Sequence, residues 1–412
     1  MGRRLKRKKN NHRKWCIFLG ILICIASIQL AVLTFVWASQ NKNIQKPPSW
    51  IAVEEGKNES TEEDIGVPVE VQDSEKIDFN VDEELQEESL VEDEEATIIK
   101  PIRKNITISA AGDFTLGNYL PTYEANTFDD VFRKQGQDYT YFLSNVKEIF
   151  EADDLTLVNL EGPLTNATAH MDKPFPFKGA PSYVNILTSG SVEAVNVANN
   201  HSHDYFEQGH QDTLRALENA SVGYYGYGHQ YIKEIEGVKI GVLGYKTWAK
   251  TDPFIATLKK EITYMKEKTD LLIVSFHWGD ERTYFPNEVQ KYFAHLSIDL
   301  GADLIIGHHP HVIQGIERYK DRAIVYSLGN FCYGGHRNPP DKDTFIFQQT
   351  FVFDEDNQWL IEESTENIIP CRISSVIHRN DYRPTPLEGE EKERLYKRIE
   401  ELSAPLSIQP FQ

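Results

Sequence analysis

Apolar and polar positions divide the chain into regular elements from residue 104 onward. Runs rich in Val, Ile, Leu and Phe occur at 105–117, 155–165, 192–204, 239–245, 270–281, 302–312, 323–331 and 345–355. Amphipathic stretches between them predict helices at about 139–152, 182–188, 209–220, 255–269 and 287–301. Short buried strands interleaved with helices are typical of an α/β protein whose sheets are covered on both faces. We therefore expect one α/β domain over residues 104–380, followed by a C-terminal extension, 381–412, with a short charged helix.

The amino terminus carries a membrane signal. A basic arm, residues 1–14, precedes an uncharged apolar run at 15–37 that has a tryptophan at each end. About 20 apolar residues span a bilayer, and positive charges before the span hold the arm in the cytoplasm. This predicts a single-pass protein of the cell membrane with its C-terminal domain outside the cytoplasm. A cleaved signal peptide remains the alternative, because "VWA" at 36–38 offers small residues for cleavage.

Charge differs sharply between regions. The net charge of −20 divides into +10 over residues 1–50, −17 over 51–96 and +2 over 97–103, which leaves −15 for residues 104–412. Residues 38–103 are acidic and hold few apolar positions, so we expect a solvated linker there. Nucleic-acid binding requires a basic face, which an acidic domain argues against. An anionic substrate would need a cation at the site to reverse the local field.

Polar residues stand at the ends of the predicted strands. The residues concerned are Asp113, Glu161, Asn199, Asn200, His201, His277, His309, His311 and Asn330. The carboxyl ends of strands are where sites assemble in open α/β folds. Taken singly, each has a simpler explanation: Asp113 as a cap, Asn199 and Asn200 as a turn, His277 as a hydrogen-bonded core residue. Together they predict one shared site.

The residue types indicate a metal centre. Carboxylate, carboxamide and imidazole groups suit zinc, manganese or iron. In "HPH" the period of an extended strand places His309 and His311 on one side. Glu161 could bridge two ions, as in two-metal hydrolases. His201 is the candidate general acid or anion holder, and either His203 or Asp204 would orient it.

Six motifs resemble those of a known family. "GDFTLG", "NLEGPLT", "VANNHSHDY", "HWGDE", "GHHPHV" and "YSLGNF" follow the order found in the bacterial CapA capsule-synthesis family, which is associated with poly-γ-glutamate and with an N-terminal membrane anchor. That family looks like a branch of the calcineurin-like metallophosphoesterases. The resemblance implies a four-layer α/β/β/α sandwich and one or two divalent ions.

The resemblance also assigns residues. Those enzymes bind two metals through D-x-H, G-D, G-N-H, a lone His and G-H-x-H. The matching positions here are Asp113, Glu161, Asn200 with His201, His277, and His309 with His311. Thr115 stands where the first motif has its histidine, and His308 is an additional residue in the last motif.

Two hypotheses follow. The first is a membrane-anchored, metal-dependent hydrolase acting outside the cytoplasm on a phosphoester or on an amide-linked polymer such as poly-γ-glutamate, with His201 and Asp204 in catalytic roles. The second is a non-catalytic assembly or export factor for an anionic surface polymer. Either would work beside membrane-bound polymer synthases. The sequence has no G-x-S-x-G elbow and no Walker loop, and Cys332 has no neighbouring base.

Overall fold

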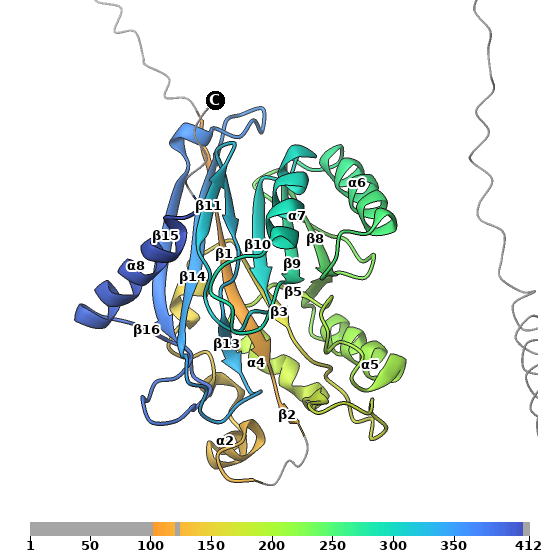
Figure 1. Ribbon diagram of the computed structural model, residues 1–412, viewed down its shortest axis with the longest axis vertical. Coiled ribbons are helices and arrows are strands. Elements are labelled where there is room, and N and C mark those ends of the chain that lie inside the picture. Colours follow the sequence, from red (N-terminus) through yellow and green to blue (C-terminus); the bar gives the residue numbers. More distant parts are fainter. Residues whose placement is uncertain (1–101, 120–123, 407–412) are drawn as a thin grey trace, which may run out of the picture. The chain divides into compact units, whose positions relative to one another are not determined.

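Two β-sheets form the centre of the structure. A computed structural model describes residues 102–119 and 124–406 (Figure 1). The larger sheet of this part has the order β16 (Thr385–Pro386), β15 (Thr365–Arg372), β14 (Asp343–Phe353), β1 (Lys104–Thr115), β3 (Leu155–Leu160), β5 (Ala194–Asn196) and β6 (Gly223–Tyr225), with β13 (Asn330–Tyr333) also paired to β1. The smaller has the order β11 (Ile316–Tyr319), β12 (Arg322–Val325), β10 (Leu304–His308), β9 (Leu271–Trp278), β8 (Val238–Thr247) and β7 (Tyr231–Ile235). A short ribbon pairs β2 (Asn118–Tyr119) with β4 (Phe177–Lys178).

Helices cover the outer face of each sheet. The helices are α2 (Phe128–Lys134), α3 (Lys147–Glu151), α4 (Val184–Ser189), α5 (Phe206–Asn219), α6 (Asp252–Lys266), α7 (Glu288–Asp299) and α8 (Gly389–Ser403), with 3₁₀ turns η2 (Tyr139–Tyr141), η3 (Pro181–Tyr183) and η4 (Ile361–Glu363). Helices α2 to α5 share a core with the larger sheet, and α6 and α7 share one with the smaller, at the right of Figure 1. A third core lies between the sheets. The layers are therefore helix, sheet, sheet and helix.

Alternation along the strands explains this layering. In β1, Ile106 and Ile108 belong to the core between the sheets, whereas Phe114 belongs to the core under the helices. In β9, Ile273 faces the other sheet and Val274 faces α6 and α7. Successive side chains of a strand point to opposite faces, so a strand buried on both faces must be apolar throughout. This confirms the predicted α/β class.

Two predicted elements differ from the structure. The run at 323–331 is not one strand, because β12 belongs to the smaller sheet and β13 to the larger, and the chain passes between them at Gly329, whose φ is +73°. The predicted helix at 139–152 is reduced to η2 and the short α3. Between them Ser144 bonds the carbonyl of Tyr141 and Asn145 bonds Thr385, so both side chains favour a turn.

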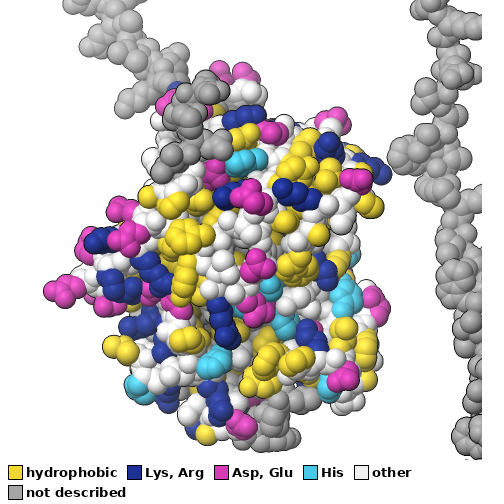
Figure 2. All heavy atoms as spheres, viewed as in Figure 1, with side chains coloured by type: hydrophobic (Ala, Val, Ile, Leu, Met, Phe, Trp, Pro, Cys, Tyr) yellow, Lys and Arg dark blue, Asp and Glu magenta, His cyan; other side chains and the backbone are white. Residues whose placement is uncertain are grey.

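The C-terminal helix is part of the fold. Helix α8 places Leu395 and Ile399 in the core between the sheets. None of the helices within 102–119 and 124–406 is long and apolar enough to cross a membrane. The predicted span at 15–37 and the predicted linker as far as residue 101 lie outside the described residues. On the face drawn in Figure 2, Lys and Arg are interspersed with Asp and Glu.

Candidate metal centre

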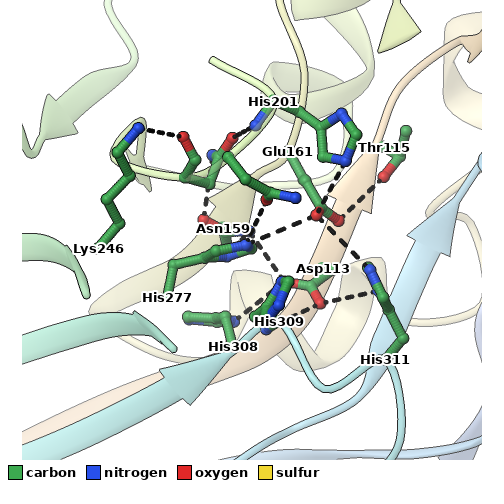
Figure 3. A network of polar contacts seen from close by, with 12 residues as sticks. Asp113, Thr115, Asn159, Glu161, His201, Lys246, His277, His308, His309 and His311 are labelled. Carbon is green, nitrogen blue, oxygen red and sulfur yellow. Dashed lines mark hydrogen bonds and ion pairs between the residues drawn. The ribbon is translucent and has the colours of Figure 1, made fainter. Parts of the chain in front are cut away.

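The predicted ligands meet between the strand ends of the two sheets. Asp113 lies near the end of β1 and Glu161 directly follows β3, both in the larger sheet. His277 lies in β9 of the smaller sheet, and His309 and His311 follow β10. The sheets stack face to face, so these ends border one space, and Figure 3 shows the side chains pointing toward one another.

Carboxylates and imidazoles approach at distances that suit a shared ion. Glu161 Oε1 lies 3.7 Å from both His277 Nε2 and His311 Nε2, and Asp113 Oδ2 lies 3.5 Å from His311 Nδ1. Hydrogen bonds between such atoms are shorter, about 2.7–3.2 Å. Two ligands bound at about 2.1 Å to one tetrahedral ion stand about 3.4 Å apart. The spacing is close to that of a metal centre.

Several buried polar atoms at this point have no hydrogen-bond partner. They are Glu161 Oε1, His309 Nδ1 and both ring nitrogens of His308, all in residues that are at most 6% exposed. An unsatisfied buried polar group costs about 1–3 kcal/mol, more when charged. A cation would satisfy the carboxylate and the imidazole lone pairs together. The residues therefore fit a divalent metal.

Three overlapping ligand groups occur among the described residues. They are Glu161 with His277 and His309, Asp113 with Glu161 and His311, and Glu281 with His309 and His311, and the ligand atoms of each group lie within 4.8 Å of one another. Glu161 is common to the first two groups. Glu161 thus lies between the two groups, where the sequence predicted a bridging carboxylate.

Without a metal, Asp113, His277 and His309 are in the form that binds metals, whereas Glu161 and His311 are not. Burial lowers the pKa of His277 well below its usual value and that of His309 to about 4, so both imidazoles are neutral, the form that binds metals. Burial opposes ionisation of Asp113, but the neighbouring histidines hold its pKa well below the usual range. Burial raises the pKa of Glu161 to about 8, whereas Glu161 and Asp113 outweigh burial at His311 and raise its pKa to about 10. A divalent cation would favour the ionised carboxylate and the neutral imidazole.

The backbone conformation that brings His309 and His311 into the cluster differs from the predicted one. The predicted extended strand through "HPH" is wrong, because β10 ends at His308 and both His309 and His311 have positive φ, +98° and +57°. Residues other than glycine adopt such angles at a cost of about 1–3 kcal/mol, and these angles cluster at functional sites. The tight turn still brings the two rings together, with centroids 5.8 Å apart.

His201 is held by a buried carboxylate. Its Nδ1 lies 2.7 Å from Asp204 Oδ2, while its Nε2 faces Glu161 Oε1 at 4.0 Å. Asp204 is fully buried and also accepts from the backbone N–H of Phe177 at 2.7 Å and from Lys173 Nζ at 2.5 Å. Asp204 is therefore the partner that orients His201, with Nε2 directed toward the cluster. His203 is not, since its Nε2 lies 3.4 Å from Glu207.

Side-chain amides form hydrogen bonds with the proposed ligands. Asn200 Oδ1 lies 2.7 Å from His277 Nε2, which places this predicted ligand at the edge of the cluster. Asn159 Nδ2 donates to Asp113 Oδ1 at 2.8 Å, and Asn330 Oδ1 pairs with His311 Nδ1 at 2.9 Å. Such partners fix the orientation of metal ligands. The sequence reasoning did not select Asn159, although a lone polar residue in a buried strand is a usable signal.

Three further residues complete the surroundings. Thr115, at the position of the first-motif histidine, directs its hydroxyl toward Glu161 Oε2 at 3.5 Å. The additional His308 lies with Nδ1 3.5 Å from Asp113 Oδ1. Glu281, at the end of "HWGDE", is exposed at the mouth of the cluster and was also not selected from the sequence.

The model of one protein family matches residues 107–334, described as "Bacterial capsule synthesis protein PGA_cap". These residues are more than half of the chain and carry the six motifs. The chain belongs to this family. The membership that the motifs predicted is thus confirmed.

Two relatives carry related names. The chain is 28% identical over 262 residues to "Capsule biosynthesis protein CapA" of Bacillus anthracis, covering 56% of this chain and 60% of that one. It is 31% identical over 250 residues to "PGA biosynthesis protein CapA" of Bacillus subtilis, covering 55% and 63%. The matches thus span about three fifths of each relative.

A solved structure of a Staphylococcus aureus protein that carries a 5′-nucleotidase name matches 72% of this chain and 58% of its own, with 15% identity and a TM-score of 0.40. A likeness at that TM-score supports no conclusion about activity.

Proposed function

We propose that the chain is a metal-dependent hydrolase of surface-polymer biosynthesis that acts on an anionic substrate outside the cytoplasm. The observation that carries this proposal is the convergence of Glu161, His277 and His309 with buried polar atoms that no group of the described chain satisfies. The capsule description of the family and the PGA name of a relative support poly-γ-glutamate as the polymer. The bond cleaved would be a γ-glutamyl amide or a phosphoester.

The ligands would divide between one or two ions of manganese, zinc or iron. The proposed ligands are Asp113, Glu161, Asn200, His277, His309 and His311. When bound, a divalent ion would supply Lewis-acid polarisation of the scissile carbonyl or phosphoryl oxygen. The motif order and the four layers support a shared fold with the metallophosphoesterases.

His201 would move the proton. Asp204 accepts the hydrogen on Nδ1, so Nε2 is the nitrogen that faces the reacting groups. As an imidazolium it would donate its Nε2 proton to the leaving group or bind an anionic oxygen of the substrate, and burial, which lowers the pKa of His201, favours release of that proton. Lys173 neutralises Asp204 and lies 3.2 Å from His201 Nδ1, which helps to keep the dyad in place. We assign His201 and Asp204 the catalytic roles.

Residues 15–37 would anchor the protein in the cell membrane, with the folded domain on the outer side. Membrane-bound polymer synthases would be its neighbours there. The anchored protein should remain with membranes after a high-salt wash, and its folded domain should be degraded by protease added to cells without a wall. A domain released in soluble form would instead support cleavage near residue 38.

Metal content and activity test the proposal together. The purified protein should contain at least one equivalent of a transition metal by elemental analysis and should hydrolyse a member of a panel of phosphoesters and γ-glutamyl amides. The variants Glu161→Gln and His309→Ala should lose both the bound metal and the activity. His378 is exposed and is not one of the proposed ligands, so His378→Ala should keep both. Absence of stoichiometric metal in the wild-type protein would remove the basis of the proposal.

The alternative, a non-catalytic assembly or export factor, makes a different prediction in cells. Its action would not depend on the ligands, so Glu161→Ala and His309→Ala would leave polymer output normal. Loss of output with a folded, membrane-bound variant favours the hydrolase.

A further inference from the structure

Two cavities adjoin beside the metal centre. The first, of about 370 Å³, is lined by His201 and His311 of the centre and extends to Tyr284, Pro340 and Asp341. The second, of about 630 Å³, is lined by the same Tyr284, Pro340 and Asp341. Because three residues line both, the cavities form one trough that leads away from the centre. Each cavity alone is of the size that holds a small ligand.

The three acids of the second cavity are paired with two arginines, which leaves one negative charge. Arg398 binds Asp341 at 2.6 Å, and Arg394 binds Asp343 at 2.7 Å and Glu391 at 3.0 Å. Arg398 also reaches Asp343. Two guanidinium groups thus bind the three carboxylates. Figure 2 shows basic and acidic side chains mixed over α8, which carries both arginines.

Two further cations of this cavity have no carboxylate partner within the described residues. Lys342 Nζ donates to the carbonyl of Ile377 at 2.7 Å and to Asn338 at 2.6 Å, and Arg372 Nε donates to the carbonyl of Ser374 at 3.0 Å. Burial, and then the neighbouring Arg372, lowers the pKa of Lys342, so the two charges face the same space. The cavity thus holds four cations against three acids, a net charge of +1 in a domain of strong negative charge.

The first cavity also has a cation without an acidic partner, although the carboxylates of Glu281 and Asp341 line it too. Arg282 is exposed and pairs with no acid in the part of the chain that the structure describes, and its backbone N–H donates to the carbonyl of Pro310 at 2.8 Å. This hydrogen bond fixes the backbone of Arg282 next to the turn that carries His309 and His311. An acidic surface repels an anion in most places, so cations left unpaired along one trough select for anionic groups there.

We propose that the second cavity is a distal subsite, in which Lys342 and Arg372 bind anionic groups of an extended polymer while its reacting bond lies at the metal centre. This deepens the proposed function and rests on it for the position of the reacting bond only. A monomeric substrate would engage the first cavity alone. A polymer would gain charge contacts along the trough, with Arg282 between the centre and the subsite.

Binding of probes of two lengths tests the subsite without requiring catalysis. Fluorescent γ-glutamyl oligomers of two and ten residues are titrated with the full chain in neutral detergent, with anisotropy as the readout. The decamer should bind at least tenfold more tightly than the dimer. The double variant Lys342→Gln, Arg372→Gln should lose about tenfold for the decamer and little for the dimer, and its binding should depend less on salt. The matched control Lys259→Gln, Lys260→Gln makes the same charge change on the exposed face of α6 and should change neither.

Each other outcome has a defined meaning. Equal binding of decamer and dimer by the wild type, or unchanged decamer binding by the double variant, overturns the subsite even if the protein hydrolyses its substrate. A length preference that the double variant loses, in a protein without hydrolytic activity, retains the subsite and rejects the hydrolase. Inorganic polyphosphate of about ten units, bound in place of the glutamyl decamer, would retain the subsite and assign a phosphate polymer. If the double variant does not fold, Arg372→Gln alone carries the test.

Discussion

Replacement of His308 by leucine should lower the stabilisation of the protein by metal. The imidazole is 1% exposed and neither ring nitrogen has a hydrogen-bond partner. An unsatisfied buried polar group costs about 1–3 kcal/mol, and leucine has a similar volume without polar atoms. Leucine also removes the contact of Nδ1 with Asp113 Oδ1 at 3.5 Å, which offsets this relief, so His308→Leu should change the stability of the metal-free protein by less than about 1 kcal/mol.

The stability that metal adds should fall if His308 contributes to the centre. Metal at 100 times its Kd stabilises the folded state by about 2.7 kcal/mol. Loss of even a supporting partner of a metal ligand weakens binding about 10–100-fold. The stabilisation by metal should then fall to between about 0.4 and about 1.4 kcal/mol. Urea titrations followed by tryptophan fluorescence, with metal and with chelator, measure the stability of the metal-free protein and the stability that metal adds.

His295→Leu is the matched control. His295 Nε2 pairs with Glu317 Oε1 at 2.8 Å, outside the centre. This substitution should destabilise the protein by about 1 kcal/mol and leave the metal increment unchanged. The reasoning is refuted if His308→Leu behaves like the control. A wild-type protein that gains no stability from any divalent metal would refute the metal centre itself.

Three further predictions concern the fold. Burial raises the pKa of Asp153 to about 7, so the folded state holds a proton that the unfolded state releases near pH 4. The free energy of unfolding should therefore fall by about 2 kcal/mol between pH 4 and 7, after allowance for solvent screening. Urea titrations across this pH range should show the fall in the wild type and a flatter dependence in Asp153→Asn. At Gly112 an added Cβ would meet the carbonyl oxygen of Gly329 at 2.1 Å, so Gly112→Ala should cost about 3 kcal/mol in thermal unfolding. At Gly136 an added Cβ meets no neighbour, so Gly136→Ala should cost only the strain of its φ of +71°, about 1 kcal/mol. Cys332 and Cys371 are buried free thiols with raised pKa values, and peptide mapping should find them unmodified by thiol reagents until the protein unfolds.

Much of the site could be predicted because strand ends are visible in the sequence. Asp113, Glu161 and His277 each end or closely follow an apolar run, and parallel strands deliver such residues to a common edge. The α/β class followed from the same pattern. The layering of two sheets was available only from the motif resemblance, since periodicity does not say which buried face meets a helix and which meets another sheet.

What could not be predicted depends on backbone angles and on long-range pairing. The positive φ of His309 has no signature in "HHPH", because only tertiary contacts select that conformation. Asn159 gains its role from Asp113, 46 positions away in the sequence. The break of the run at 323–331 into strands of two sheets likewise follows from the partner available to each half, β10 for the first and β1 for the second.

The buried position of the centre means that its polar atoms need partners, and this need explains which residues are found there. Strand ends that are buried on both faces exclude water, so every polar atom directed into the space between the sheets must find a partner there. The amides of Asn159 and Asn330 satisfy Asp113 and His311, but Glu161 Oε1 and His309 Nδ1 are left to a group from outside the chain. A fold that needed only stability would place apolar side chains at these positions, since paired buried charges rarely stabilise more than a packed apolar core. The retained carboxylate and imidazoles are therefore best explained by a cation that they hold.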